Sequence, residues 1–190
     1  MKIEISLIRH GKSVLNGNKK KNCEEFKKWV NNYNLSGVVE EKELPPSTLK
    51  KVAHAKVVIT SDLKRSIESA KILRNNVHIM TDTLFREVEL PIPSSKLGNI
   101  KLKPQVWSGI LRCLWFCGYS NSCESYESAK ERAKQAAGQL IEYAEEYHSV
   151  VVVGHGFFNL LLAKELIKRG WNGQKMKSSK HWSVTSYTYM

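Results

Sequence analysis

The sequence has no long hydrophobic run, no internal repeat and no low-complexity linker. No apolar stretch approaches the ~20 residues that a membrane-spanning helix needs. The chain enters an apolar segment at once, without a basic leader or a small-residue cleavage site, so we expect a cytoplasmic protein. A length of 190 residues suits one well-buried domain, which we place at residues 1–190.

Cysteine is also scarce, and its four positions do not indicate a metal site. In a chain without an export signal these thiols are expected to be reduced. Cys113 and Cys117 would share a helical face, but a zinc site needs four convergent ligands, and His148 lies well away in the sequence. We therefore expect no metal and no cofactor, and we interpret the cysteines as small buried hydrophobic residues.

The formal net charge of +12 is the main compositional bias. A basic surface attracts nucleic acid, anionic membranes and small anionic substrates alike. The lysines are mostly scattered, apart from residues 19–21 and the tail at Lys175, Lys177 and Lys180. The chain lacks a nucleic-acid-binding motif and a basic strand with interleaved aromatic residues. We expect no specific nucleic-acid or membrane partner, and nothing indicates the oligomeric state.

Predicted strands alternate with predicted helices along the chain. Apolar or alternating segments indicate strands at 2–8, 56–60, 77–80, 149–153 and 181–189. Helical spacing indicates helices around Phe26 to Tyr33, at 45–52, after a cap at Ser61 or Asp62, at 125–147 and at 157–168. This order is typical of an α/β fold, a three-layer α/β/α sandwich with a mostly parallel central sheet. We expect the aromatic residues of the first helix to lie in the core.

The segment 94–123 is the least regular part of the sequence. Its middle is apolar and aromatic, with Trp107, Trp115 and Phe116, and glycines lie near both ends. Two interpretations stay open, a lid or insertion that faces the substrate and a packed helical hairpin. If these aromatic residues border the site, an aromatic or apolar leaving group would be accommodated.

Cationic and imidazole side chains follow three of the predicted strands. Arg9 and His10 end the first strand, Arg65 follows the second, and His155 lies between two glycines after the strand 149–153. In an open α/β sheet the carboxyl ends of the strands and the N-termini of the helices gather at one edge, where anions bind. Guanidinium groups match phosphate oxygens. We therefore predict a phosphate pocket with a histidine nucleophile.

An ordered set of motifs resembles the histidine phosphatase superfamily, which includes cofactor-dependent phosphoglycerate mutases and fructose-2,6-bisphosphatase. The set consists of Arg9-His10-Gly11 with Ser13 and Asn16, Ser61-Asp62-Leu63 with Arg65 and Ala70, Phe85-Arg86-Glu87, Cys123-Glu124-Ser125-Tyr126, and Val153-Gly154-His155-Gly156. The resemblance implies a phosphoglycerate mutase-like fold and His10 as the nucleophile. It also implies a phosphate held by Arg9, Asn16, Arg65 and His155, and Glu87 as general acid and base. Glu89 is the rival acid, but only Glu87 aligns with the family pattern.

Two departures from this pattern bear on the activity. Lys12 replaces the usual glutamate or glutamine, and Leu90-Pro91-Ile92-Pro93 replaces the usual glycine and tryptophan. Family mutases also tend to be longer, with insertions that keep water from the intermediate. We expect a metal-independent phosphomonoesterase that acts on a small phosphorylated substrate. The alternatives are mutase-type phosphoryl transfer and a protein that binds a phosphorylated ligand without turning it over.

Overall fold

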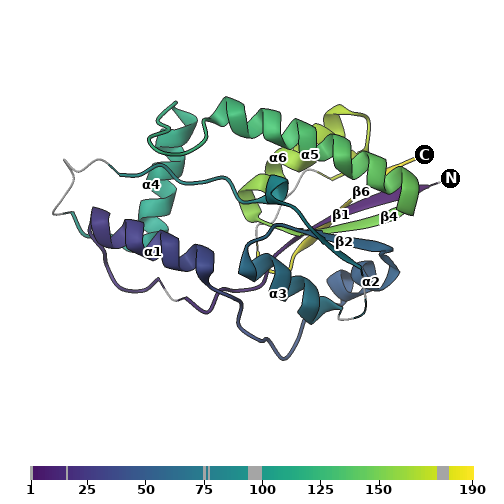
Figure 1. Ribbon diagram of the computed structural model, residues 1–190, viewed down its shortest axis with the longest axis horizontal. Helices are drawn as coiled ribbons and strands as arrows, with labels where there is room; N and C mark the ends of the chain where they lie inside the picture. The colour runs from purple at the N-terminus through teal and green to yellow at the C-terminus, as the bar shows by residue number, and fades with distance from the viewer. Residues whose placement is uncertain (1, 16, 75, 77, 94–99, 175–179) are drawn as a thin grey trace.

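The structure, a computed structural model, describes residues 2–15, 17–74, 76, 78–93, 100–174 and 180–190. In these residues six strands form one sheet, in the order β3-β2-β4-β1-β6-β5 (Figure 1). The parallel strands are β1 (Ile3–Arg9), β2 (Val57–Thr60), β3 (Ile79–Thr81) and β4 (Ser149–Gly154). The antiparallel strands are β5 (Asn172–Gly173) and β6 (Val184–Tyr189). The predicted α/β class with a mostly parallel sheet is confirmed.

The register of the three central strands brings their carboxyl ends together. Arg9 of β1 lies opposite Gly154 of β4, and Thr60 of β2 lies opposite Val153. The residues that follow these strands, namely His10, Ser61 and His155, therefore meet at one edge of the sheet.

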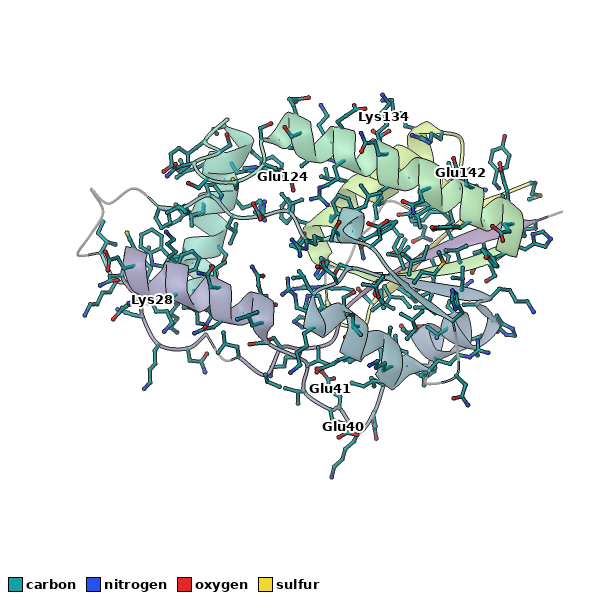
Figure 2. The ribbon with its side chains drawn as sticks, in the orientation of Figure 1. Lys28, Glu40, Glu41, Glu124, Lys134 and Glu142 are labelled. Carbon is teal, nitrogen blue, oxygen red and sulfur yellow. The ribbon has the colours of Figure 1, made fainter. Side chains whose placement is uncertain are left out.

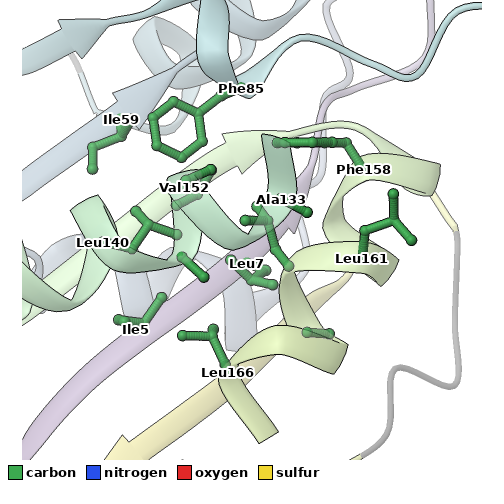
Figure 3. Close-up of a cluster of buried hydrophobic side chains, with 14 of the residues drawn as sticks. Ile5, Leu7, Ile59, Phe85, Ala133, Leu140, Val152, Phe158, Leu161 and Leu166 are labelled. Carbon is green, nitrogen blue, oxygen red and sulfur yellow. The ribbon is translucent and has the colours of Figure 1, made fainter. Parts of the chain in front are cut away.

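Helices cover both faces of this sheet (Figure 1). The helices α5 (Tyr126–Tyr147) and α6 (Gly156–Lys168) lie on one face, and α2 (Pro46–His54) and α3 (Lys64–Leu73) lie on the other. Figure 3 shows Ile5 and Leu7 of β1 packed against Leu140 of α5 and Leu166 of α6. The four valines of β4 are buried on both faces, as expected for a central parallel strand.

Two further helices stand beyond the carboxyl end of β1. These are α1 (Cys23–Leu35) and α4 (Pro104–Phe116), which pack together through Phe26, Trp107 and Leu111 (Figure 1). An Asn22–Glu25 capping box begins α1. Residues 100–123 contain the one helix α4 rather than the two of a helical hairpin, and residues 94–99 lie outside the described part. A lid function for 94–123 stays a prediction.

Tertiary contacts shift several predicted boundaries. The last strand begins at Val184 instead of His181, because Trp182 has a φ of 62° and its N–H donates to the carbonyl of Arg9. The N-cap of α3 is Leu63, not Ser61 or Asp62, since the Ser61 hydroxyl contacts His155 and the Asp62 carboxylate pairs with Arg86. A short 3-10 helix, η1 (Thr83–Phe85), follows β3.

The surface carries most of the charged residues. Figure 2 shows Lys134 and Glu142 on the outer side of α5 and Lys28 on α1, and all three are exposed. Of the four cysteines, Cys23 is buried, whereas Cys113 and Cys117 are exposed. The prediction of buried cysteines is therefore wrong for these two. None of the helices in the described part of the chain combines the length and apolar character that crossing a bilayer requires.

Candidate active site

The loop after β1 is fixed on three sides and holds His10 at the edge of the sheet. The main-chain N–H of His10 donates to the carbonyl of Gly154 (2.9 Å), and that of Gly11 donates to Oγ of Ser69 (2.8 Å). The Trp182 ring covers Gly11, where a Cβ atom would lie 2.1 Å from Cζ2 of the indole. Glycine is therefore required at this position.

The His10 ring is buried and has a defined tautomer. Its Nδ1 lies 2.7 Å from the carbonyl oxygen of Gly11, which can only accept a hydrogen bond. Nδ1 therefore carries the proton and Nε2 keeps its lone pair. Burial, and then the positive charges of Arg65 and Arg9, hold the pKa of His10 well below 6.5. The ring is thus neutral at neutral pH, with a free nucleophilic nitrogen.

His155 is the N-cap of α6 and lies fully buried beside His10, with the two ring centroids 5.1 Å apart. Its Nε2 is 2.7 Å from Oγ of Ser61. Its Nδ1 is buried and has no hydrogen-bond partner among the described residues. Burial, followed by His10 and Arg65, holds the pKa of His155 well below 6.5. This buried ring nitrogen is therefore available to contact a bound ligand.

Arg65 lies in the first turn of α3 and is only 2% exposed. Its Nη1 donates to the carbonyl of Tyr33 (3.2 Å) and to Oδ1 of Asn34 (3.3 Å), at the C-terminal end of α1. Its Nε is buried without an acceptor in the described part of the chain. Arg9 lines the same cavity from the end of β1. These cations suit an anion with several oxygens.

Glu87 occupies the N-terminus of α6. Its carboxylate accepts the N–H groups of Phe157 (3.1 Å) and Phe158 (2.9 Å), and also that of Val88 (2.9 Å). The sequence led us to expect that an anion would bind at the helix N-termini gathered at this edge. At α6 the N–H groups of Phe157 and Phe158 bind the Glu87 carboxylate, and the helix terminus thereby positions this side chain. Glu89, the rival acid, is exposed.

Two arginines fix the main chain on either side of Glu87. Arg132 donates to the carbonyls of Leu84 (2.8 Å) and Arg86 (2.9 Å) and also pairs with Glu124. Arg112 donates to the carbonyls of Val88 (2.8 Å) and Glu89 (3.2 Å). Burial lowers the pKa of Arg112.

The structure brings five of the six predicted site residues together, namely Arg9, His10, Arg65, Glu87 and His155. Asn16, the sixth, lies outside the described residues. Sequence reasoning missed His181, whose Nδ1 donates to the carbonyl of His10 (2.9 Å) and whose ring centroid lies 5.4 Å from that of His10. No local pattern indicated this, because it depends on the pairing of β6 with β1.

A cavity of about 1510 Å³ is lined by Arg9, Arg65, Glu87 and His181 of this site, and also by residues of α1 and α4. Trp107 and Trp115 do not border it, since both are buried and donate their indole N–H groups to main-chain carbonyls. Phe116 does border it. Of the helix aromatics that we expected in the core, Phe26 is buried there and Trp29 packs against the same cluster, but Trp29 and Tyr33 also line the cavity.

Solved structures with the same fold include a mycobacterial glucosyl-3-phosphoglycerate phosphatase (TM-score 0.60, 18% identity, covering 99% of this chain and 91% of that one). A phosphoglycerate mutase from Bacillus anthracis str. Sterne matches with a TM-score of 0.62 and 17% identity, over 100% and 88% of the two chains. A phosphoserine phosphatase from Entamoeba histolytica, solved with 3-phosphoglyceric acid, matches with a TM-score of 0.60 and 16% identity, over 96% and 89%. At these identities the likeness establishes the fold.

A comparison with curated proteins finds no match. The sequence matches the family model of the histidine phosphatase superfamily (branch 1) over residues 5–190. This match covers all the motifs gathered at the edge of the sheet, from Arg9 and His10 to His155. The chain therefore belongs to the histidine phosphatase superfamily, branch 1.

Proposed function

We propose that this protein is a metal-independent phosphomonoesterase that hydrolyses a small phosphorylated substrate through a phosphohistidine at His10. The observation that carries the proposal is the Nδ1–H of His10 donated to the carbonyl of Gly11. It leaves Nε2 unprotonated in a buried ring whose pKa is held low by burial and neighbouring cations. A neutral imidazole in a cationic pocket suits attack on phosphorus.

In the first step, Nε2 of His10 attacks phosphorus and the bond from phosphorus to the ester oxygen breaks. Glu87 gives a proton to the departing oxygen, so that an alcohol leaves. For this donation Glu87 has to hold a proton when the step begins. Arg9 and Arg65 stabilise the equatorial oxygens as negative charge spreads over them.

His155 adds a neutral hydrogen-bond donor. When Ser61 donates its hydroxyl proton to Nε2 of His155, Nδ1 carries the ring proton and can donate it to a phosphoryl oxygen. If Nε2 of His155 donated to Ser61 instead, Nδ1 would be unprotonated and its lone pair would face the anionic phosphate. A bound phosphate therefore selects the Nδ1–H tautomer.

In the second step, water attacks the phosphohistidine while Glu87 takes its proton. The bond from phosphorus to nitrogen breaks, which regenerates neutral His10 and releases inorganic phosphate. The wide cavity that Arg9, Arg65 and Glu87 line supports hydrolysis over mutase-type transfer, since a mutase must keep water from its intermediate.

We also propose that residues 1–190 act as one domain in the cytoplasm. The strand order supports the single domain, because β1, from the first residues, lies in one sheet between β4 and β6, from the last third of the chain. The exposed thiols of Cys113 and Cys117 suit a reducing compartment.

Phosphate release from p-nitrophenyl phosphate between pH ~4 and ~8, with EDTA present, tests this activity. We expect turnover that resists chelation and falls by about 10³-fold or more in His10→Ala, because the variant has no nucleophile. His54→Ala removes an exposed histidine of α2 and should act like the native chain.

Rapid quench with a labelled substrate should also trap a phosphorylated native protein and an unlabelled His10→Ala variant. Full activity in His10→Ala would contradict the proposal. Conversion of 3-phosphoglycerate to 2-phosphoglycerate faster than phosphate release would replace hydrolysis by mutase activity.

A further inference from the structure

The cavity lined by Arg9 and Arg65 continues well beyond these phosphate-binding residues. Tyr33 marks the transition, since the guanidinium carbon of Arg65 lies 4.7 Å from the centre of its ring. One helical turn away, the Trp29 ring stacks on Tyr33 with centroids 5.2 Å apart and an angle of 25° between the planes. Both rings line the cavity. An aromatic wall on α1 therefore begins where the phosphate site ends.

Aromatic rings from α4 and α6 also line the cavity. Phe116, at the end of α4, is 49% exposed, and its ring centroid lies 5.7 Å from that of Phe157 in α6. Both residues border the same cavity as Trp29 and Tyr33. An exposed phenylalanine beside a catalytic cavity offers apolar surface that a bound ligand would cover.

The buried or paired arginines of this region are already committed to protein groups. Arg86 pairs with Asp62, and Arg132 pairs with Glu124. Arg112 donates to two carbonyls and lies 4.3 Å from the centre of the Phe157 ring. A second anionic group on the substrate would have to compete for these arginines or bind the exposed Lys12 and Lys27, which line the same cavity. An apolar group could pack against the exposed ring of Phe116 without displacing any of these contacts.

We propose that the space between α1 and α4 is the subsite for the leaving group, and that this group is a flat, ring-bearing apolar one. Trp29, Tyr33 and Phe116 would contact it while the phosphate lies against Arg65. A short carboxylate-bearing substrate, such as phosphoserine, would leave these rings uncovered. The assignment rests on the proposed phosphatase activity, which it makes specific for a substrate class.

The test compares kcat/KM for 2-naphthyl phosphate, phenyl phosphate and O-phosphoserine. We expect the naphthyl ester to be the best substrate and phosphoserine the poorest, since the larger ring covers more of the aromatic wall. Trp29→Ala should lower kcat/KM for the naphthyl ester by about tenfold or more, with phosphoserine within about twofold. Leu35→Ala, which removes an exposed side chain from the same helix, is the matched control.

Phe116→Ala provides an independent variant, because this exposed side chain can be removed without opening the core. It should lower the preference for the naphthyl ester in the same direction. An equal effect of Trp29→Ala and Phe116→Ala on all three esters, or a native preference for phosphoserine, would overturn the subsite.

Calorimetric binding of 2-naphthyl phosphate and inorganic phosphate separates this inference from the activity itself. A chain that turns over no phosphomonoester contradicts the proposed function, yet the subsite still predicts tighter binding of the naphthyl ester than of phosphate. That difference should shrink in Trp29→Ala and not in Leu35→Ala. Equal affinities in the native chain would refute the subsite, whatever the activity.

Discussion

At the scale of single residues, the site depends on which nitrogen of each histidine carries a proton. A main-chain carbonyl settles this for His10. For His155 the partner is the Ser61 hydroxyl, which can donate or accept. Ser61 also accepts the N–H of Leu63 (3.3 Å), which leaves its own proton available for His155. Ser61 is therefore a positioning residue that sets the tautomer of His155.

Replacing Ser61 by alanine should lower kcat by about tenfold, since His155 loses the hydroxyl that holds its ring and favours the Nδ1–H form. Ser61→Thr keeps a hydroxyl and should restore most of the rate. Nitrogen chemical shifts of His155 with bound phosphate provide the decisive measurement. A structural role alone would lower the melting temperature of Ser61→Ala but leave the proton on Nδ1.

The residues that could be predicted from the sequence are those attached to strand ends. Apolar runs end at or just before Arg9, His10 and His155. The geometry of a parallel sheet therefore places these three side chains close together. His181 was missed because it enters the site through the antiparallel pairing of β6 with β1. Trp29 and Tyr33 have the spacing of a core helix, and the same spacing serves a helix whose inner face borders a cavity.

At the scale of elements, the position of Glu87 depends on its connections to α6 and α4. The N-terminus of α6 binds its carboxylate through two N–H groups. From α4, Arg112 binds the carbonyls of Val88 and Glu89. From the sequence we predicted the helix α6 and, independently of it, the role of Glu87. The sequence could not indicate their contact, because the contact joins groups that are 70 and 71 residues apart.

Arg112→Met keeps the apolar contacts of the side chain but removes both hydrogen bonds to the segment after Glu87. We expect kcat to fall by about tenfold, since misplacing the acid raises the barrier, with a loss of about 1–3 kcal/mol in unfolding free energy. Lys130→Met, on the exposed surface of α5, should change neither quantity. Steady-state kinetics with urea unfolding measures both effects.

If Arg112 serves stability alone, the Arg112→Met variant would unfold more easily and yet keep its kcat. That result would show that the contact from α4 does not position Glu87 for catalysis.

At the scale of the whole molecule, the site brings buried histidines and positively charged arginines together. The packing of the rest of the fold must offset the free-energy cost of this arrangement. His10 and His155 are buried beside arginines, so both rings are held neutral and their pKa values are depressed. The surrounding core is extensive, and it includes both faces of the sheet. The net charge of +12 predicted an anionic ligand only in general terms, because most of that charge is on exposed lysines.

The depressed pKa values of His10 and His155 predict that acid destabilises the protein well before its carboxylates titrate. Below the unfolded pKa of about 6.5, the unfolded chain binds protons that the folded chain excludes, so the free energy of unfolding falls as pH falls. Between pH ~7.5 and ~5.5, each histidine should contribute a loss on the order of 1 kcal/mol, measurable by urea unfolding. The Asp62–Arg86 pair lowers the pKa of Asp62 from 3.8, so it does not contribute in this window. Burial and Arg9 also lower the pKa of His181, so His10→Gln should remove only part of the loss, and His54→Gln should leave it unchanged. Equal stability of the native chain at both pH values would show that the two rings are not held neutral by the fold.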